Sequence, residues 1–484
     1  MDIVGKFTKL KKTDYLALLI CLLFLGAYLT LALVKHAHFG TGYDLSVDNQ
    51  IVWEYSKFLP PIMTVHAYAF TPVFYDHVEF VYALLAPFYW ILPDARMLII
   101  LQVLAIILSG IPIYLLSKKY KINNLASLAF LISYYMFFGV QNALWSDVHS
   151  LTFGVAFLTF FIYFLDSRKK WPTLLFFALA LISKEDIGFL TFFIAFVYFI
   201  KTRWKLNLLI MAASALFLYI VFFIFYPNFT LGYQYANTGG LLSNIDLSNL
   251  FNTAEKRSVY IYSLLQTGFL SLLNPLFLIP YFADLGHYFV FGSERTTSAQ
   301  GLFLHYRASL AVFSIWPAIM AVSKFKKLNN KFLALYVLFF AFLVTYLLHS
   351  PLTYLSKKWF WAEPSGVKNI KQAINFLPKD AYVVTQVNIS PHISNRELIV
   401  TMWGEGKEFP KNSPCGEPKC DWFKWAGEPR YMLVDTSPEW NILHLLANRE
   451  DFIEGLKNME KEGIIKKHKQ FDSATIYRVY ARPY

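Results

Sequence analysis

The chain has 484 residues, of which 56% are hydrophobic and only 16% are charged, and its mean hydropathy is +0.42. In a soluble globular protein about a quarter of all residues are charged. This composition therefore excludes a soluble enzyme and indicates a polytopic membrane protein. The formal net charge is +12, but the basic residues lie in short loops between apolar runs. That pattern encodes membrane topology, so we expect no nucleic acid partner.

Basic clusters predict which loops face the cytoplasm. They are the N-terminal lysines, SKKYK (117–121), DSRKK (166–170), KTRWK (201–205) and KFKKLNNK (324–331). Cytoplasmic loops of membrane proteins are enriched in Lys and Arg. We therefore predict a multi-pass protein of the cell membrane with a cytoplasmic N-terminus and an extracytoplasmic C-terminal domain. Anionic lipid headgroups are the expected counter-charge.

Apolar runs near the length needed to cross a bilayer predict about eleven spans. The first, from Tyr15 to Val34, is too long for a cleavable signal and lacks a cleavage site. The segment from Val78 to Leu92 is short and interrupted by Pro87, which predicts an interfacial or re-entrant helix. If the segment from Val78 to Leu92 were instead a true span, the basic loop SKKYK would lie on the extracytoplasmic side, against the charge rule. The other spans are expected at 96–116, 124–141, 150–165, 171–183, 187–200, 206–226, twice within 259–290, at 307–323 and at 332–349.

The composition becomes that of a soluble domain from about Glu363. An amphipathic helix (NIKQAINFLPKD), two strands (AYVVTQV and YMLVD), a second helix (DFIEGLKNMEKEG) and a closing hairpin predict a small α/β domain. The predicted fold is therefore an α-helical polytopic membrane domain, residues 1–358, followed by an extracytoplasmic α/β domain, residues 359–484. Cys415 and Cys420 in PCGEPKC either form a local disulfide or remain two thiols.

The predicted outer loops collect acidic residues and histidines, whereas the cytoplasmic loops are merely basic. The candidates are Asp44 and Asp48 in GYDLSVDNQ, His77 in YDHVEF, Asp147 and His149 in WSDVHS, Lys184, Glu185 and Asp186 in ISKEDIGF, and His305, Tyr306 and Arg307 in LHYR. Three ionisable groups between two short apolar runs, as in KED, are costly unless they face a cavity or each other. The alternative is a simple polar hairpin between two short helices.

Each of the other motifs has a structural and a functional interpretation. Asp44 and Asp48 would share one helix face and repel each other, unless a cation or a proton lies between them. Asp147 either caps the helix that begins near Ser150 or supplies, with His149, two ligands to a metal ion. Arg307 either contacts lipid headgroups or binds a phosphate in bidentate fashion.

These motifs, together with the C-terminal runs LPKDAYVVTQVNISPHISNRELIV and EPRYMLVDTS, resemble a family of multi-pass proteins called domain of unknown function 2079. That family is similar in architecture to GT-C glycosyltransferases, which carry an acid in the first extracytoplasmic loop and another in a later loop. The resemblance implies that Asp44 matches the first acid and Asp147 the later one. The first loop of GT-C enzymes commonly contains an adjacent Asp-Glu pair, which this sequence lacks. The resemblance therefore does not decide whether Asp44 or Asp48 is the catalytic base.

We therefore expect a membrane glycosyltransferase that moves a sugar from a polyprenyl-phosphate donor to a lipid, glycan or protein acceptor at the outer face. A transporter or flippase is the alternative, in which buried acids would carry protons or ions. The expected partners are the polyprenyl-phosphate-linked sugar and membrane lipid, with a monomer or small homo-oligomer. A divalent ion, Mg or Mn, would be held by Asp44 and His149. The catalytic candidates are Asp44, Asp48, Asp147 and Glu185, and the substrate-binding candidates are His77, His149, Lys184, Asp186, His305, Tyr306 and Arg307.

Overall fold

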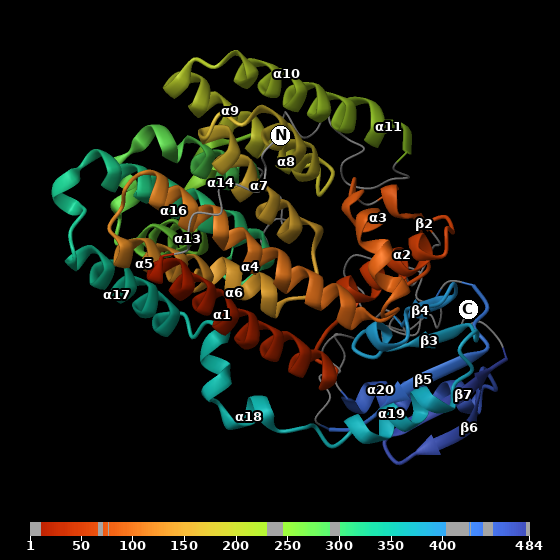
Figure 1. Cartoon of the computed structure of the whole chain (residues 1–484). Helices are drawn as coiled ribbons and strands as arrows, with labels where there is room; N and C mark the ends of the chain where they lie inside the picture. The colour runs from red at the N-terminus through yellow and green to blue at the C-terminus, as the bar shows by residue number, and fades with distance from the viewer. Residues whose placement is uncertain are drawn as a thin grey trace. The chain divides into compact units, whose positions relative to one another are not determined.

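The computed structural model describes residues 11–65, 71–75, 77–229, 245–290, 301–402, 425, 427–438 and 449–480. The chain forms two compact units (Figure 1). The first, here the helical unit, comprises residues 1–32, 74–81 and 100–357. The second, here the sheet unit, comprises residues 33–73, 82–99 and 358–484. Two long helices, α1 (Lys12–Ala37) and α4 (Ala95–Lys119), continue from one unit into the other.

The helical unit follows the apolar runs of the sequence closely. Its further helices are α5 (Asn124–Tyr135), α6 (Phe138–Trp145), α7 (Ser150–Asp166), α8 (Lys170–Leu181), α9 (Ile187–Thr202), α10 (Lys205–Tyr219), α11 (Tyr226–Phe229), α13 (Ala254–Leu265), α14 (Ile279–Phe289), α16 (Ala308–Lys324) and α17 (Phe332–Leu347). Short 3-10 turns lie at Val73–Tyr75, Leu247–Leu250, Leu270–Leu273, Pro275–Leu278, His305–Arg307, Lys326–Leu328 and Pro351–Ser356. A π-helical turn at Ile220–Phe225 joins α10 to α11.

In the described part of the chain, four continuous helices are long and apolar enough to cross a membrane: Lys12–Ala37, Ala95–Lys119, Lys205–Asn228 and His305–Lys324. The pair α5 and α6 would form a fifth, bent by 42°. The break lies in the predicted span 124–141, and the Gln141 side chain donates to the carbonyl of Met136 at 2.6 Å. This bond satisfies a backbone acceptor that the break leaves without a helical partner. Five further apolar helices are shorter, so the count of eleven spans stays a prediction.

Helix α16 forms the centre of the helical unit. Residues 308–322 are all buried, and the helix packs against α5, α6, α7 and α14. Alanine and serine occupy many of its positions, which lets neighbouring helices approach closely. Its first residues follow directly on His305, Tyr306 and Arg307, so this motif is held against the best-packed helix of the unit.

The sheet unit contains a five-stranded sheet in the order β4-β3-β5-β7-β6. The strands are β3 (Val383–Thr385), β4 (Ile399–Thr401), β5 (Tyr431–Asp435), β6 (Ile465–Phe471) and β7 (Ala474–Val479). β3 pairs in parallel with β4 and β5, and the closing hairpin is antiparallel. The helices α19 (Val367–Phe376) and α20 (Arg449–Lys461) follow the predicted amphipathic segments, and a short α18 (Lys358–Trp361) precedes them. The predicted α/β fold is confirmed; the short strand β4 had no distinct signal in the sequence.

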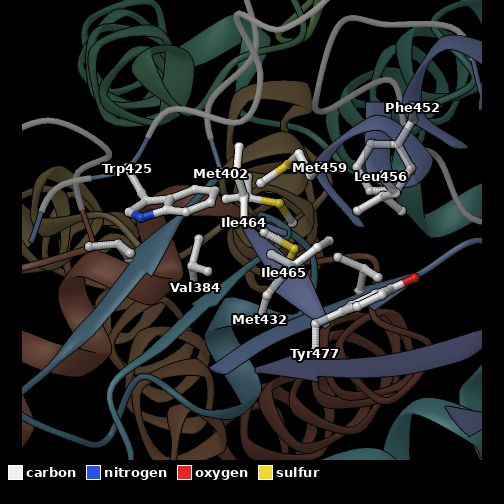
Figure 2. Close-up of a cluster of buried hydrophobic side chains, with 12 residues drawn as sticks. Val384, Met402, Trp425, Met432, Phe452, Leu456, Met459, Ile464, Ile465 and Tyr477 are labelled. Atoms are coloured by element: carbon white, nitrogen blue, oxygen red, sulfur yellow. The ribbon is translucent and has the colours of Figure 1, made fainter. Parts of the chain in front are cut away.

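Figure 2 shows the core between α20 and the sheet. Phe452, Leu456 and Met459 recur at helical spacing on α20 and are buried against Met432 and Val384 from the strands. This core explains why the C-terminal segment folds as an α/β layer.

The segment between α1 and α4, predicted to be the first extracytoplasmic loop, lies largely in the same unit as this sheet. It contains α2 (Tyr43–Ser56), a short β1–β2 ladder (Ile62–Met63 with Thr71–Pro72), α3 (Val81–Leu85) and a 3-10 turn, η2 (Ala86–Trp90). The Thr401 N–H donates to the carbonyl of Val65 at 3.0 Å, so this loop adds backbone pairing at the edge of β4. The Gln50 side chain donates to the carbonyl of Arg396 at 3.0 Å. The loop and the C-terminal segment therefore fold together.

Candidate functional site

The KED motif forms a buried turn between α8 and α9 in the helical unit. The Lys184 Nζ lies 3.8 Å from Glu79 Oε1, and Glu79 also accepts a hydrogen bond from the Ser150 hydroxyl at 2.5 Å. Burial alone would lower the pKa of Lys184, but the carboxylates of Glu79, Glu185 and Asp186 raise it well above its usual value. The three ionisable side chains of this turn are therefore compensated by one another and by Glu79, and a role of KED in lining a cavity stays a prediction.

Glu185 pairs with a histidine of the YDHVEF motif. His77 Nδ1 lies 2.7 Å from Glu185 Oε1, and the Val78 N–H donates to the other carboxylate oxygen at 3.2 Å. Glu185 is buried, whereas the His77 side chain is 23% exposed. A buried carboxylate beside a partly exposed imidazole is an arrangement suited to proton transfer or to hydrogen bonding of a polar substrate. The neighbouring Asp76 lies outside the described residues.

Asp186 meets two residues that the sequence interpretation missed, because they lie in an apolar run assigned to the membrane. His287 Nε2 on α14 lies 3.8 Å from Asp186 Oδ2. Asp284, one turn earlier on α14, accepts a hydrogen bond from the Ser309 hydroxyl at 2.6 Å. Burial raises the pKa of Asp186, but the imidazole of His287 and the ammonium of Lys184 outweigh it and bring the pKa to about 2. The i, i+3 spacing of Asp and His in ADLGHYF was the available signal.

The WSDVHS and LHYR motifs also meet. The rings of His149 and His305 are stacked, with centroids 3.4 Å apart and planes inclined by 18°. The His149 N–H donates to the Gln102 side chain at 2.9 Å, which fixes the start of α7. His149 is itself the N-terminal boundary residue of α7, and no side chain caps this helix end. The capping interpretation of Asp147 is therefore wrong, and Asp147 lies partly buried in the preceding turn.

Arg307 is fully buried at the start of α16. Its Nε donates to the carbonyl of Gly301 at 3.0 Å, and the guanidinium lies 5.2 Å from the ring centre of Tyr288 and 5.3 Å from that of Phe289. Within the described residues, neither Nη1 nor Nη2 has a hydrogen-bond partner. Buried charged donors are almost always paired, because leaving them unpaired costs several kcal/mol. The aromatic rings stabilise the cation but leave its two terminal donors for an anion. Tyr306 packs against both Tyr288 and His305.

The two acids of the first loop have different environments in the sheet unit. Asp44 is exposed in the first turn of α2. Asp48, one turn later, is buried and accepts a hydrogen bond from the Tyr82 hydroxyl at 2.5 Å. The hydroxyl thus stabilises Asp48 as a structural acceptor, while Asp44 is accessible to solvent. That Asp44 faces a cavity shared with the KED turn stays a prediction.

Metal binding receives no support from the side chains that the structure describes. Among them, no three His, Cys, Asp or Glu residues are grouped so that they could hold a metal ion. A divalent ion held by Asp44 and His149 stays a prediction, and we derive no reaction step through a metal. Cys415 and Cys420 lie outside the described residues, and Cys21 is a buried free thiol.

Among the polar side chains described in the helical unit, those of the sequence motifs and of α14 form an acid–base cluster and a buried cation, Arg307; Asp166 with Lys119 and Lys201 forms a separate ion-pair group. The cluster comprises His77, Glu79, Lys184, Glu185, Asp186, Asp284 and His287. These side chains come from the turns that flank α3, α8 and α9 and from α14, and α9 packs directly against α14 (Figure 1). Such a set can hydrogen-bond hydroxyl groups, exchange protons and, through Arg307, hold an anionic group.

Comparison with solved structures gives a likeness in fold. No curated protein sequence matches the chain. The crystal structure of ArnT from Cupriavidus metallidurans bound to undecaprenyl phosphate is similar in fold, with a TM-score of 0.54 and 11% sequence identity. The likeness covers 98% of this chain and 99% of that one. The chain therefore has a GT-C-like fold, as its motifs implied. Residues 35–431 match the family described as Predicted membrane protein (DUF2079), and the chain belongs to that family.

Proposed function

We propose that this protein is a membrane glycosyltransferase that moves a sugar from a polyprenyl-phosphate donor to a lipid, glycan or protein acceptor. The observation that carries the proposal is the buried Arg307, whose two terminal nitrogens have no partner among the described residues. A guanidinium with both donors available suits bidentate binding of a phosphate. The structurally similar ArnT is bound to a lipid phosphate, undecaprenyl phosphate, which supports this class of donor.

In the proposed reaction, an acceptor hydroxyl attacks the anomeric carbon of the donor sugar. The bond between that carbon and the phosphate oxygen breaks, and polyprenyl phosphate leaves with the bonding electrons. Arg307 stabilises the charge that develops on the departing phosphate. Electrostatic stabilisation by a preorganised group is usually the largest single contribution to an enzyme's rate enhancement. The acceptor proton passes to a carboxylate base.

We assign the base to Asp44 rather than to Asp48. Asp44 is exposed at the first turn of α2, whereas Asp48 is buried and engaged by the Tyr82 hydroxyl. A general base must reach the proton that it removes, so an accessible carboxylate is the better candidate. Asp48 then holds α2 against α3.

We assign the acid–base cluster to recognition of the polar groups of the substrates. Its side chains are paired with one another: His77 is hydrogen-bonded to Glu185, and Lys184 forms an ion pair with Glu79. Groups preordered in this way can accept and donate to sugar hydroxyls at little entropic cost. We place Asp147, His149 and His305 at the edge of the same cluster as further substrate contacts.

Buried ionisable residues in a membrane protein are also typical of a transporter, so the test must separate transfer from transport. The chain is reconstituted in vesicles with a labelled polyprenyl-phosphate sugar and a lipid extract that contains acceptors. A transferase yields a labelled product of new mass, and Asp44→Asn forms it about 10²–10⁴-fold more slowly. The exposed acid Glu363 supplies the matched control, Glu363→Gln, which keeps full transfer.

Movement of the intact donor between leaflets without a new product would favour the transporter. Undiminished transfer by Asp44→Asn, with the product confirmed by mass, would remove Asp44 from the mechanism while leaving the transferase assignment intact.

A further inference from the structure

The short helix formed by α3 and η2 has two faces with different surroundings. Tyr82, Leu85, Ala86 and Tyr89 are buried. The opposite side, here called the apolar face, consists of Ala83, Leu84, Pro87, Phe88, Trp90 and Ile91, all exposed. It contains no charged residue and no side-chain hydroxyl or amide, and Trp90 and Ile91 are 63% and 78% exposed. A helix that faces water normally carries polar residues on its exposed side.

We propose that the apolar face inserts into the lipid interface of the bilayer, and that the buried face fixes the acid-bearing helix α2 at that depth. Four residues after Ile91 the chain enters α4, a 25-residue helix apolar enough to span the membrane. Because only a short link separates the apolar face from this span, the face lies close to the bilayer, and lipid is the partner expected to cover it. Lys57 and Arg96 are exposed and near this segment in sequence, and the Arg96 guanidinium is paired with Asp94 at 2.8 Å.

The end of α2 contributes a second aromatic ring to the same surface. The Phe58 ring is 85% exposed and lies 6.2 Å from the ring of Trp90. Phe58, two residues after the end of α2, has a φ of 58°, a left-handed conformation that favours glycine and costs a bulky residue about 1–2 kcal/mol. An exposed phenylalanine in a strained conformation is unfavourable in water, but insertion of the ring into lipid offsets both costs.

Trp90 has the geometry of an interfacial anchor. Its indole N–H donates to the carbonyl of Ser56 at 2.8 Å, so the polar edge is satisfied by α2 while most of the ring is exposed. Tryptophan concentrates at the membrane–water interface for this reason, since one edge is polar and the rest apolar.

The buried face connects the lipid to α2 through two tyrosines spaced seven residues apart. The Tyr82 hydroxyl donates to Asp48 at 2.5 Å, and the Tyr89 hydroxyl donates to Asn49 at 2.6 Å. Both acceptors lie one turn after Asp44. Tyr82 and Tyr89 are therefore positioning residues: they hold α2, and with it the Asp44 carboxylate, at the height of the inserted helix. The effect of this positioning on sugar transfer rests on the proposed function; the insertion itself does not.

Spin labelling of the full chain in lipid nanodiscs tests the insertion. A background with Cys21→Ser, Cys415→Ser and Cys420→Ser receives single cysteines at Leu84, Phe88 or Ile91, and at exposed Glu363 as the matched control. We expect the three labels to relax with oxygen and to be shielded at least fivefold from a water-soluble nickel chelate relative to position 363. Their depth should be about 5–10 Å below the phosphates. Equal access to nickel at all four positions would overturn the proposal, as would dipolar broadening that shows a second copy on this face.

A label at Lys57 tests the connection to α2. The double variant Tyr82→Phe/Tyr89→Phe should increase the mobility of this label, while Tyr346→Phe, which alters an exposed tyrosine of α17, should leave it unchanged. Unchanged mobility in the double variant would show that the tyrosines do not position α2. Insertion can also be checked without cysteine variants. Brominated lipid quenches tryptophan fluorescence, and the part due to Trp90 is the quenching measured for the wild type minus that measured for Trp90→Phe. No loss of quenching in Trp90→Phe would contradict the insertion, and neither readout requires turnover.

Discussion

The backbone of Gly139 on α6 lies directly against that of Arg307. A Cβ atom at residue 139 would be 2.0 Å from the carbonyl oxygen of Arg307, a distance that no packed structure tolerates. The missing side chain therefore lets α6 fix the backbone that carries the buried guanidinium. This contact makes the position of the cation a property of the helix packing and not of a flexible loop.

Gly139→Ala should displace Arg307. We expect at least a tenfold loss of polyprenyl-phosphate binding, together with destabilisation of about 1–3 kcal/mol from overpacking. Gly26→Ala is the matched control, because nothing lies within 4 Å of a Cβ at that helical position. Ligand-binding titrations and thermal unfolding in detergent measure the two effects. Normal binding by a folded Gly139→Ala protein would show that the packing does not position Arg307.

The buried pair Lys184–Glu79 should be strongly coupled. Lys184→Met leaves the surrounding carboxylates uncompensated and should cost about 3–5 kcal/mol of stability. Adding Glu79→Gln should restore part of this loss, with a coupling energy of about 0.5–3 kcal/mol in a double-mutant cycle. The exposed pair Lys371–Glu363, at 3.3 Å, is the control and should show a coupling below about 1 kcal/mol. Additive effects at Lys184 and Glu79 would contradict the described network.

Asp44 and Asp48 should respond differently to the same substitution. Asp44→Asn should lower transfer by about 10²–10⁴-fold, the range typical of a general base, without changing the melting temperature. Asp48→Asn should destabilise the protein by about 1–3 kcal/mol, because the Tyr82 hydroxyl loses a charged acceptor in a buried site. The reverse pattern, with an inactive but stable Asp48→Asn protein, would move the base to Asp48.

Glu54 should make stability depend on pH. Burial raises the pKa of this carboxyl from 4.5 to about 8, with Glu397 adding to the effect and the Ile62 N–H opposing it. The folded state then binds the proton more tightly than the unfolded state. The contribution of Glu54 to stability is therefore fully present below pH 4.5 and is lost as the pH rises to about 8, by on the order of a few kcal/mol. Melting temperatures of Glu54→Gln should lack this decrease, whereas Glu363→Gln should retain it. A wild-type protein whose melting temperature rises over this pH range would exclude the assignment.

Apolar runs predicted most of the helices, because burial in lipid or protein demands long uninterrupted segments whatever the tertiary arrangement. The shortness of the segment from Val78 to Leu92 and its interruption by Pro87 predicted an interfacial or re-entrant helix. The structure gives the short α3 and η2, and their place in the membrane stays a prediction. The association of the first loop with the C-terminal sheet could not be predicted. It depends on single hydrogen bonds between residues far apart in the chain, such as Gln50 with Arg396.

Some residues of the candidate site could be recognised in the sequence because they interrupt apolar runs, and others could not. KED and LHYR stand out because charges interrupt apolar sequence, and the structure finds Lys184, Glu185 and Arg307 buried. Asp284 and His287 were missed, since a single acid and a single histidine in an apolar helix resemble ordinary buried residues. Only the packing of α14 against α9 gives them a role.

Binding of a lipid phosphate to Arg307 is the central claim, and equilibrium binding of undecaprenyl phosphate to the purified chain tests it most directly. Arg307→Gln should weaken binding about 10–100-fold, as expected for the loss of charge-assisted hydrogen bonds worth about 1.5–3 kcal/mol. The exposed Arg257 provides the control Arg257→Gln, which should bind like wild type. Equal affinity of a folded Arg307→Gln protein and the wild type would contradict the account.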